Sequence, residues 1–309
     1  MLMRYCLFSL LLAGASFAQL SQRITITSAA SFQRGLPSKG SLGTAFCSGF
    51  VVPGVTYATT NPLPLTLGGI SLTVGTAPAP ILAVADGGGY INFEVPQEAL
   101  PNSDGTWKVA ASQNGTQITA QVEMSQSPGD FFLAGPTLGA IQHAADFSLV
   151  TEQNPAHAGE VLVGYLTGLP GTQPTVPTGE AAPFLPLAVV PQPNNVVLVD
   201  QFAILLNGMV IANSCSVANA PCQASNVLFL GLTPGIAGVY QVNFVVPSST
   251  SAGNLTVQLQ RSRCAVLFGA PCGGMGAPFV ANAVPGCLRV GGGGDRDVCT
   301  GSAVLLPIR

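Results

Sequence analysis

The strongest constraint in this sequence is a short strand pattern that occurs twice. Residues 90–96 read YINFEVP and residues 241–247 read QVNFVVP. In each copy an aliphatic residue, Phe and Val occupy alternate positions and so share one face of a strand, which Pro then ends. The Asn on the opposite face recurs after 151 positions. The pattern therefore predicts two copies of one β domain.

The shared residues of these strands are interpreted as architectural. They are Asn92, Phe93 and Pro96 in the first copy and Asn243, Phe244 and Pro247 in the second. A functional site is seldom duplicated so symmetrically. We therefore expect the Asn side chains to hold the fold, for example by hydrogen bonds that tie a neighbouring loop.

A second pair of matching blocks, in the same order, supports the duplication. Residues 40–49 and 159–168 both begin and end with Gly and carry an aromatic residue six positions after the first Gly. These blocks are 119 positions apart, so the second copy must hold about 32 more residues before its Asn strand. Two insertions are visible in the second copy. They are the Pro-rich residues 170–195, expected as a long surface loop, and residues 213–226, expected as a disulfide-stapled hairpin tip.

Composition favours β structure throughout. Charged residues make up only 7% of the chain but hydrophobic residues 48%, and that much apolar content argues against disorder. Gly (37) and Pro (25) are abundant, which predicts short strands separated by turns. We expect an all-β chain with sandwiches at 19–126 and 127–263 and a Cys/Gly-rich tail at 264–309, too small for its own apolar core. A net charge of −3 gives no indication of a basic surface that would bind nucleic acid.

The N-terminus has the features of a secretory signal peptide. Arg4 precedes a short apolar run, and Ser16 to Ala18 place small residues where signal peptidase reads. The run is too short to span a bilayer, and no later apolar run of membrane length is uninterrupted. We expect cleavage after Ala18, a secreted, cell-surface or periplasmic location, and no transmembrane segment in the mature chain.

Seven cysteines remain after cleavage, and an oxidising compartment makes disulfides the default interpretation. Sequential pairs are favoured, although spacing does not fix connectivity: Cys215 with Cys222, Cys264 with Cys272, and Cys287 with Cys299. Each would close a short loop and contribute about 2–3 kcal/mol. Cys47 is left over and is expected to be a buried small hydrophobe. Zinc is the alternative, but no CxxC pair occurs and both His lie far from these Cys.

No catalytic motif is recognisable: GxSxG, HExxH and Walker sequences do not occur. His143 and His157 lie near Asp146, Glu152 and Glu160 in the sequence. That set would need a nucleophile or a further ligand beside it to form a site, and we expect loop residues instead. The Gly-rich residues 291–297 lack the features of a calcium loop. We assign no catalytic, cofactor-binding or metal-binding residue.

Blocks spread over residues 24–262 resemble the Solibacter-type C-terminal domain family of secreted acidobacterial proteins. The blocks that carry the resemblance are 28–32 (SAASF), 62–70 (PLPLTLGGI), 77–81 (APAPI), 91–96 (INFEVP), 154–156 (NPA), 165–169 (YLTGL), 231–235 (GLTPG) and 238–243 (GVYQVN). The resemblance implies two tandem immunoglobulin-like sandwiches. It implies no activity, because the family has no established function. Tyr90 departs from the family pattern, and the tail lies outside it.

Three functional hypotheses follow. The first is a non-enzymatic extracellular module that binds or displays, contacting a polysaccharide or a surface protein through the loop 170–195 and the Cys215–Cys222 tip, which the sandwich does not need. The second is a structural spacer or assembly domain that associates through exposed sheet edges. A hydrolase with an unrecognised site is the least favoured.

Overall fold

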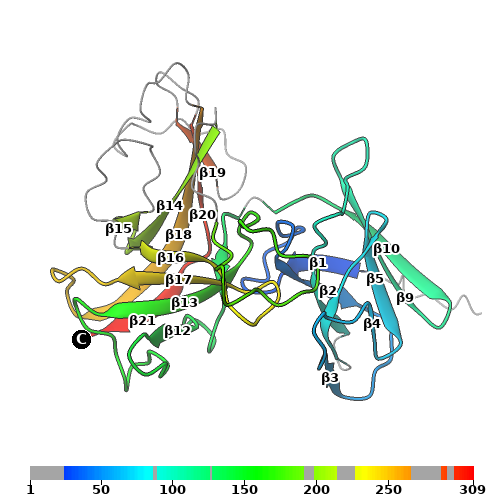
Figure 1. The fold of residues 1–309 in the computed structure, drawn as a ribbon, viewed down its shortest axis with the longest axis horizontal. Coiled ribbons are helices and arrows are strands. Elements are labelled where there is room, and N and C mark those ends of the chain that lie inside the picture. Colours follow the sequence, from blue (N-terminus) through cyan, green and yellow to red (C-terminus); the bar gives the residue numbers. More distant parts are fainter. Residues whose placement is uncertain are drawn as a thin grey trace, which may run out of the picture.

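The computed structural model describes residues 24–85, 89–125, 127–190, 198–213, 227–265, 287–290 and 296–309. Within these ranges the chain is all-β, as predicted, and its strands form four antiparallel sheets. The sheets pack in two pairs, each around its own apolar core, and the two resulting sandwiches lie side by side (Figure 1). No helix that could cross a membrane is found in this part of the chain. The predicted signal peptide lies outside the described residues.

The first sandwich contains the strands before residue 123 (blue to blue-green in Figure 1). One sheet has the order β1 (Ile24–Ser28), β2 (Leu42–Cys47), β8 (Tyr90–Glu94), β7 (Ile81–Ala85) and β3 (Val55–Tyr57). The facing sheet has the order β10 (Thr116–Val122), β9 (Trp107–Gln113), β5 (Ile70–Val74) and β4 (Thr66–Leu67), with β6 (Ala77–Pro78) paired to β5. Alternate residues of β5 are buried, because one face of each strand points into the core.

The second sandwich has the same layered plan. One sheet has the order β11 (Asp130–Phe131), β13 (Val161–Thr167), β17 (Tyr240–Val245) and β16 (Val227–Leu232), with β12 (Ile141–His143) paired to β13. The other has the order β15 (Met209–Asn213), β14 (Leu198–Leu206), β18 (Gly253–Ala265), β20 (Arg296–Thr300) and β19 (Cys287–Val290), with β21 (Val304–Ile308) paired to β18.

The two Asn strands occupy corresponding places. Strand β8 lies between β2 and β7, and β17 lies between β13 and β16. Phe93 and Phe244 are both fully buried, each in its own core. Asn92 accepts a 2.7 Å hydrogen bond from Thr44 on the adjacent β2, whereas Asn243 accepts a 2.8 Å bond from Gln241 on its own strand. These bonds lie within the sheets rather than at a neighbouring loop.

The tail does not stand apart from the second sandwich. Strand β18 continues across the expected boundary at residue 263. Its first half pairs with β21 and its second half with β20. Val304, Leu306 and Ile308 alternate along β21 and are buried in the second core. The tail was expected to be too small for an apolar core of its own, and its last strand instead contributes to the core of the second sandwich.

The Pro-rich loop is also part of the sandwich. Val190 donates a 3.0 Å backbone hydrogen bond to Leu230, and Leu232 donates one of 2.9 Å to Ala188. The loop therefore covers the free edge of β16, which would otherwise expose unpaired backbone groups. Its buried apolar side chains belong to the second core, and they are Val176, Ala182, Ala188 and Val190. The expectation that the sandwich does not need this loop was wrong. Residues 191–195 and most of the 213–226 tip lie outside the described residues.

Candidate functional site

The two sandwiches meet along a joint built from β2, the end of β13 and the turn before β17. The Leu42 amide donates a 2.7 Å hydrogen bond to the Thr167 hydroxyl, which in turn donates one of 3.2 Å to the Gly238 carbonyl. Both bonds are buried. Gly238 has φ of +68°, and a Cβ added there would lie 2.6 Å from the Leu42 side chain. Only glycine suits this backbone conformation and this close approach.

A buried carboxylate ties a second part of the joint. Asp130 is buried on β11 and accepts a 2.7 Å hydrogen bond from the Ser31 hydroxyl of the first sandwich. Its other oxygen accepts a 2.8 Å bond from the Ser302 amide, just before β21. Gln33 also donates a 2.8 Å bond to the Ser302 hydroxyl. The first sandwich is thereby attached to two segments of the second that lie far apart in sequence.

Glu94, at the end of β8, faces the Pro-rich loop. It is only 3% exposed, and its Oε2 accepts a 3.0 Å hydrogen bond from the Gly179 amide. Burial raises the pKa of this carboxyl to about 7, the Gly179 bond opposes the rise, and the like charge of Glu98 adds to it. The neighbouring Tyr240 hydroxyl is buried as well, which raises its pKa, and it donates a 3.1 Å bond to the Pro170 carbonyl.

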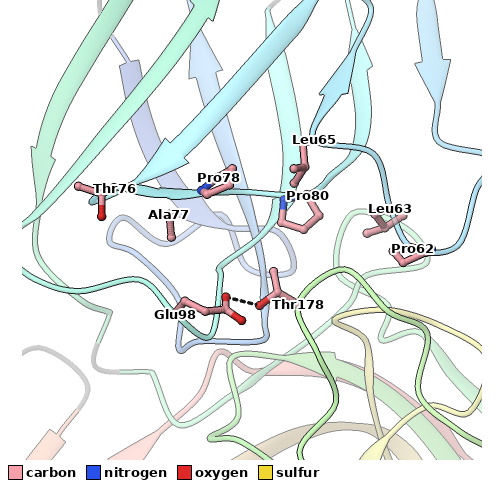
Figure 2. Close-up of a pocket in the computed structure, with 9 residues that line it drawn as sticks. All are labelled: Pro62, Leu63, Leu65, Thr76, Ala77, Pro78, Pro80, Glu98 and Thr178. Atoms are coloured by element: carbon pink, nitrogen blue, oxygen red, sulfur yellow. Dashed lines mark hydrogen bonds between the residues drawn. The ribbon is translucent and has the colours of Figure 1, made fainter.

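Beside Glu94 the joint opens into a pocket of about 470 Å³ (Figure 2). Thr178 of the loop donates a 2.7 Å hydrogen bond to Glu98 and accepts one of 3.0 Å from the Gln97 amide. The loop is held to the first sandwich by a 2.8 Å bond from the Leu63 amide to the Gly179 carbonyl. The pocket therefore lies on the first sandwich, with Thr178 of the second sandwich at its border. Its lining residues are Pro62, Leu63, Leu65, Thr76, Ala77, Pro78, Pro80, Glu98 and Thr178.

The chemistry of this pocket suits binding. Six of the nine lining residues are apolar, and the polar pair Glu98 and Thr178 lies on one side, across from Pro78, Pro80 and Leu65 (Figure 2). An apolar cavity with a few fixed polar groups is the usual form of a small-ligand site. The lining contains no Cys, Ser, Lys or His, and its Thr178 hydroxyl donates to the Glu98 carboxylate.

His143 and His157 take part in a hydrogen-bonded cluster around Glu160. His143, buried on β12, contacts Glu160 through Nδ1 and the Asn154 carbonyl through Nε2 (3.2 Å). Burial alone would lower the pKa of His143, but these contacts outweigh it and the pKa is raised. Glu160 also accepts a 2.9 Å bond from the His157 amide. These contacts hold the segment between β12 and β13 in place.

The other acidic residues of that region have separate partners. Asp146 accepts bonds from the Ser148 amide and hydroxyl, and Glu152 accepts a 3.0 Å bond from Asn254. Over the ranges that the structure describes, no group of three or more His, Cys, Asp or Glu could hold a metal ion. Residues 291–295 of the Gly-rich segment lie outside those ranges.

Of the cysteines, Cys47 is buried as a free thiol, and burial raises its pKa to about 12. Cys287 on β19 lies directly opposite Cys299 on β20 in the strand register. Cys264 lies on β18. The remaining predicted partners, Cys215, Cys222 and Cys272, lie outside the described residues. The sequential disulfides therefore stay a prediction.

The pocket was not predicted from the sequence. Its residues come from four segments that only the fold brings together, and two of these, 62–70 and 77–81, were known only as blocks of the family resemblance. One sequence feature did point toward the joint. Glu94 stands at the repeat position where the second copy has Val245. A charged residue in an otherwise buried strand pattern indicates a polar partner, which the fold shows to be the Gly179 amide of the second sandwich's loop.

No protein-family model and no curated protein matches the chain. Among solved structures, the chain is similar to the endo-fucoidan hydrolase MfFcnA4 of glycoside hydrolase family 107, with 15% sequence identity and a TM-score of 0.14. The match covers 73% of this chain and 25% of that one, so the chain spans about a quarter of its length. A TM-score this low carries no argument about fold or activity. The resemblance to the Solibacter-type family stays a prediction.

Proposed function

We propose that the protein is an exported, non-enzymatic binding module, made of two copies of one immunoglobulin-like sandwich, that holds an apolar segment of a protein in the pocket at the joint. The observation that carries this proposal is the pocket itself, which lies on the first sandwich, is bordered by Thr178 of the second and has a mainly apolar lining. The hydrogen bonds along the joint fix this lining before any ligand arrives. A preformed site saves the entropy of ordering on binding.

The lining favours a protein segment over a polysaccharide. A sugar presents many hydroxyls, and each one buried without a partner costs free energy. Only Thr76, Glu98 and Thr178 offer polar side chains here, and the last two already bond to each other. Apolar side chains of a peptide would instead gain free energy on leaving water for this surface.

The test is a peptide-display selection on the purified mature protein, followed by affinity measurements on two variants. Leu65→Asp places a charge in the pocket at a residue that is 48% exposed, so folding is preserved. Leu100→Asp is the matched control, because Leu100 is 67% exposed and does not line the pocket. We expect apolar peptides whose affinity falls at least about tenfold with Leu65→Asp and stays unchanged with Leu100→Asp.

Retention of a soluble cell-wall polysaccharide with no peptide enriched would contradict the proposal, as would peptides that bind Leu65→Asp equally well. Deleting the loop is not a useful test. Its residues Val176, Ala182, Ala188 and Val190 belong to the second core, so the deletion would unfold that sandwich.

One observation favours the alternative of assembly through sheet edges. Strand β10 is the outer strand of its sheet and carries no charged residue over its seven positions. Natural edge strands are usually protected from pairing with other chains by charge, by Pro or by a covering loop. Thr119, exposed on β10, is the position where a Lys substitution would block such pairing.

A further inference from the structure

The Pro-rich loop presents an apolar turn to solvent at residues 184–187. Phe184 is 72% exposed and Leu185 is 87% exposed, and Leu187 and Ile236 are exposed beside them. Scattered apolar residues on a surface need no explanation, but a group of them marks an interaction site. This turn is such a group, on a segment whose neighbours on both sides are buried in the second core.

The turn is firmly anchored at its base. Ala182 is buried, its amide donates to the Ile236 carbonyl, and its carbonyl accepts a 2.8 Å hydrogen bond from the Gly235 amide. A Cβ atom added at Gly235 would lie 3.2 Å from the Phe184 ring, so the ring lies close to this glycine. The apolar tip is thus held in a fixed shape while its side chains stay in water. A pre-formed projection of this kind loses little entropy on binding.

We propose that the segment received by the pocket is this turn of a second copy of the chain, with Phe184 and Leu185 of one copy inserted between the prolines and leucines of the other. This proposal rests on the proposed function, since it names the occupant of the same pocket. Phe184 does not fill the pocket of its own chain, because 72% of it is exposed.

The turn and the pocket are both mainly apolar. Residues 181–190 contain no charged side chain, so insertion brings no unpaired charge into the pocket. A cavity of about 470 Å³ falls within the roughly 300–1,000 Å³ typical of ligand sites. Glu98, the charged residue of the lining, is already bonded to Thr178 at one side.

The position of both surfaces on one loop allows reciprocal pairing. Thr178 lines the pocket and Phe184 begins the turn, with the anchoring Ala182 between them. When two copies each insert a turn into the other, the same patch serves both partners, as a two-fold interface requires. A net charge of only −3 opposes such pairing weakly.

The experiment is sedimentation velocity on the purified mature protein over a range of concentrations, alone and with three variants. Leu185→Asp disables the turn, Leu65→Asp disables the pocket, and Leu100→Asp is the control. All three residues are exposed, and unchanged melting temperatures would confirm that the variants fold. We expect wild type and Leu100→Asp to pair, and the dissociation constant of each of the other two to rise at least about tenfold.

Mixing the turn variant with the pocket variant is the most discriminating part of this experiment. Leu185→Asp keeps an intact pocket and Leu65→Asp keeps an intact turn. An equimolar mixture should therefore form hetero-pairs through one insertion and associate more tightly than either variant alone. A synthetic peptide of residues 182–188 (APFLPLA) should bind wild type, compete with its pairing, and fail to bind Leu65→Asp.

Several results would overturn the proposal. Wild type that remains monomeric at about 1 mM, or variants that pair as wild type does, would contradict self-insertion. Pairing that survives Leu185→Asp but is lost with Thr119→Lys would instead assign it to the edge of β10. If wild type stays monomeric while selected peptides still bind in a Leu65-dependent way, self-insertion fails and the proposed binding function stands.

Discussion

Replacing Glu94 with Gln should make the joint between the sandwiches insensitive to pH. The Glu94 carboxylate is buried and accepts a 3.0 Å hydrogen bond from the Gly179 amide. The carbonyl of a glutamine can accept the same bond. Glu94→Gln therefore removes a buried charge and leaves the shape and hydrogen bonding of the joint in place.

The size of the effect follows from the pKa of Glu94, which burial raises from 4.5 to about 7 in the folded protein. Because the folded-state pKa lies above the unfolded one, stability is greatest below about pH 4.5 and is lost as the pH rises through 7. A pKa difference of about 2.5, at about 1.36 kcal/mol for each unit, amounts to about 3 kcal/mol above pH 7. The pKa of about 7 results mainly from burial and already includes the opposing hydrogen bond from Gly179 and the like charge of Glu98.

The assay is urea unfolding between pH 4.5 and 8.5. We expect Glu94→Gln to match wild type at the acid end and to exceed its free energy of unfolding by about 3 kcal/mol at pH 8.5. Glu123→Gln is the matched control, since Glu123 is exposed, and it should follow wild type throughout. Identical pH profiles for Glu94→Gln and wild type, or a less stable Glu94→Gln at pH 8.5, would refute the argument.

Three further predictions concern the joint and the cores. Gly238→Ala should destabilise the protein by about 1–3 kcal/mol in thermal unfolding, because the new Cβ would lie 2.6 Å from the Leu42 side chain. Gly208→Ala is the control: Gly208 has a similar φ but open space around it, so this substitution should destabilise clearly less. Leu306→Ala should destabilise by about 2–4 kcal/mol, and an effect below about 0.5 kcal/mol would mean that β21 is not part of the second core. The buried Cys47 thiol should resist alkylation until the protein is unfolded, and its recovery in a disulfide-linked peptide would contradict its assignment as a free cysteine.

The residues that repeat were informative about the core. Ile91 and Phe93 in β8, and Val242 and Phe244 in β17, are all buried, as the alternating pattern required. A period of two along a strand is a local property, so the sequence alone displays it. Strand type and burial could therefore be predicted for the central strands of both sandwiches.

The tail and the Pro-rich loop were predicted less well, for a physical reason. Their composition, rich in Cys and Gly or in Pro, indicates irregular surface segments. Each nevertheless carries a few apolar residues that fill a core built by distant strands, such as Leu306 beside β18 and Val190 beside β16. That pairing depends on which sheet edge is left open, and a linear sequence does not display an open edge.

The pocket could not have been found without the fold. Leu65 and Pro80 are separated from Thr178 by about a hundred positions, and none of them belongs to a motif with a chemical mechanism. Glu94 was the one accessible sign, since a carboxylate replaces the Val245 of the other copy. It indicated a polar partner for Glu94, but not the open pocket beside it.

The most direct test of the central claim is a crosslinking experiment at the pocket. A photo-reactive phenylalanine is placed at position 65, the protein is mixed with an isotope-labelled copy and irradiated, and the captured peptides are identified by mass spectrometry. A pocket that receives the apolar turn of a second copy predicts crosslinks between the two isotopic forms at residues 184–187, and none when the same probe is placed at position 100. Capture of no peptide at position 65, or equal capture from both positions, would contradict it.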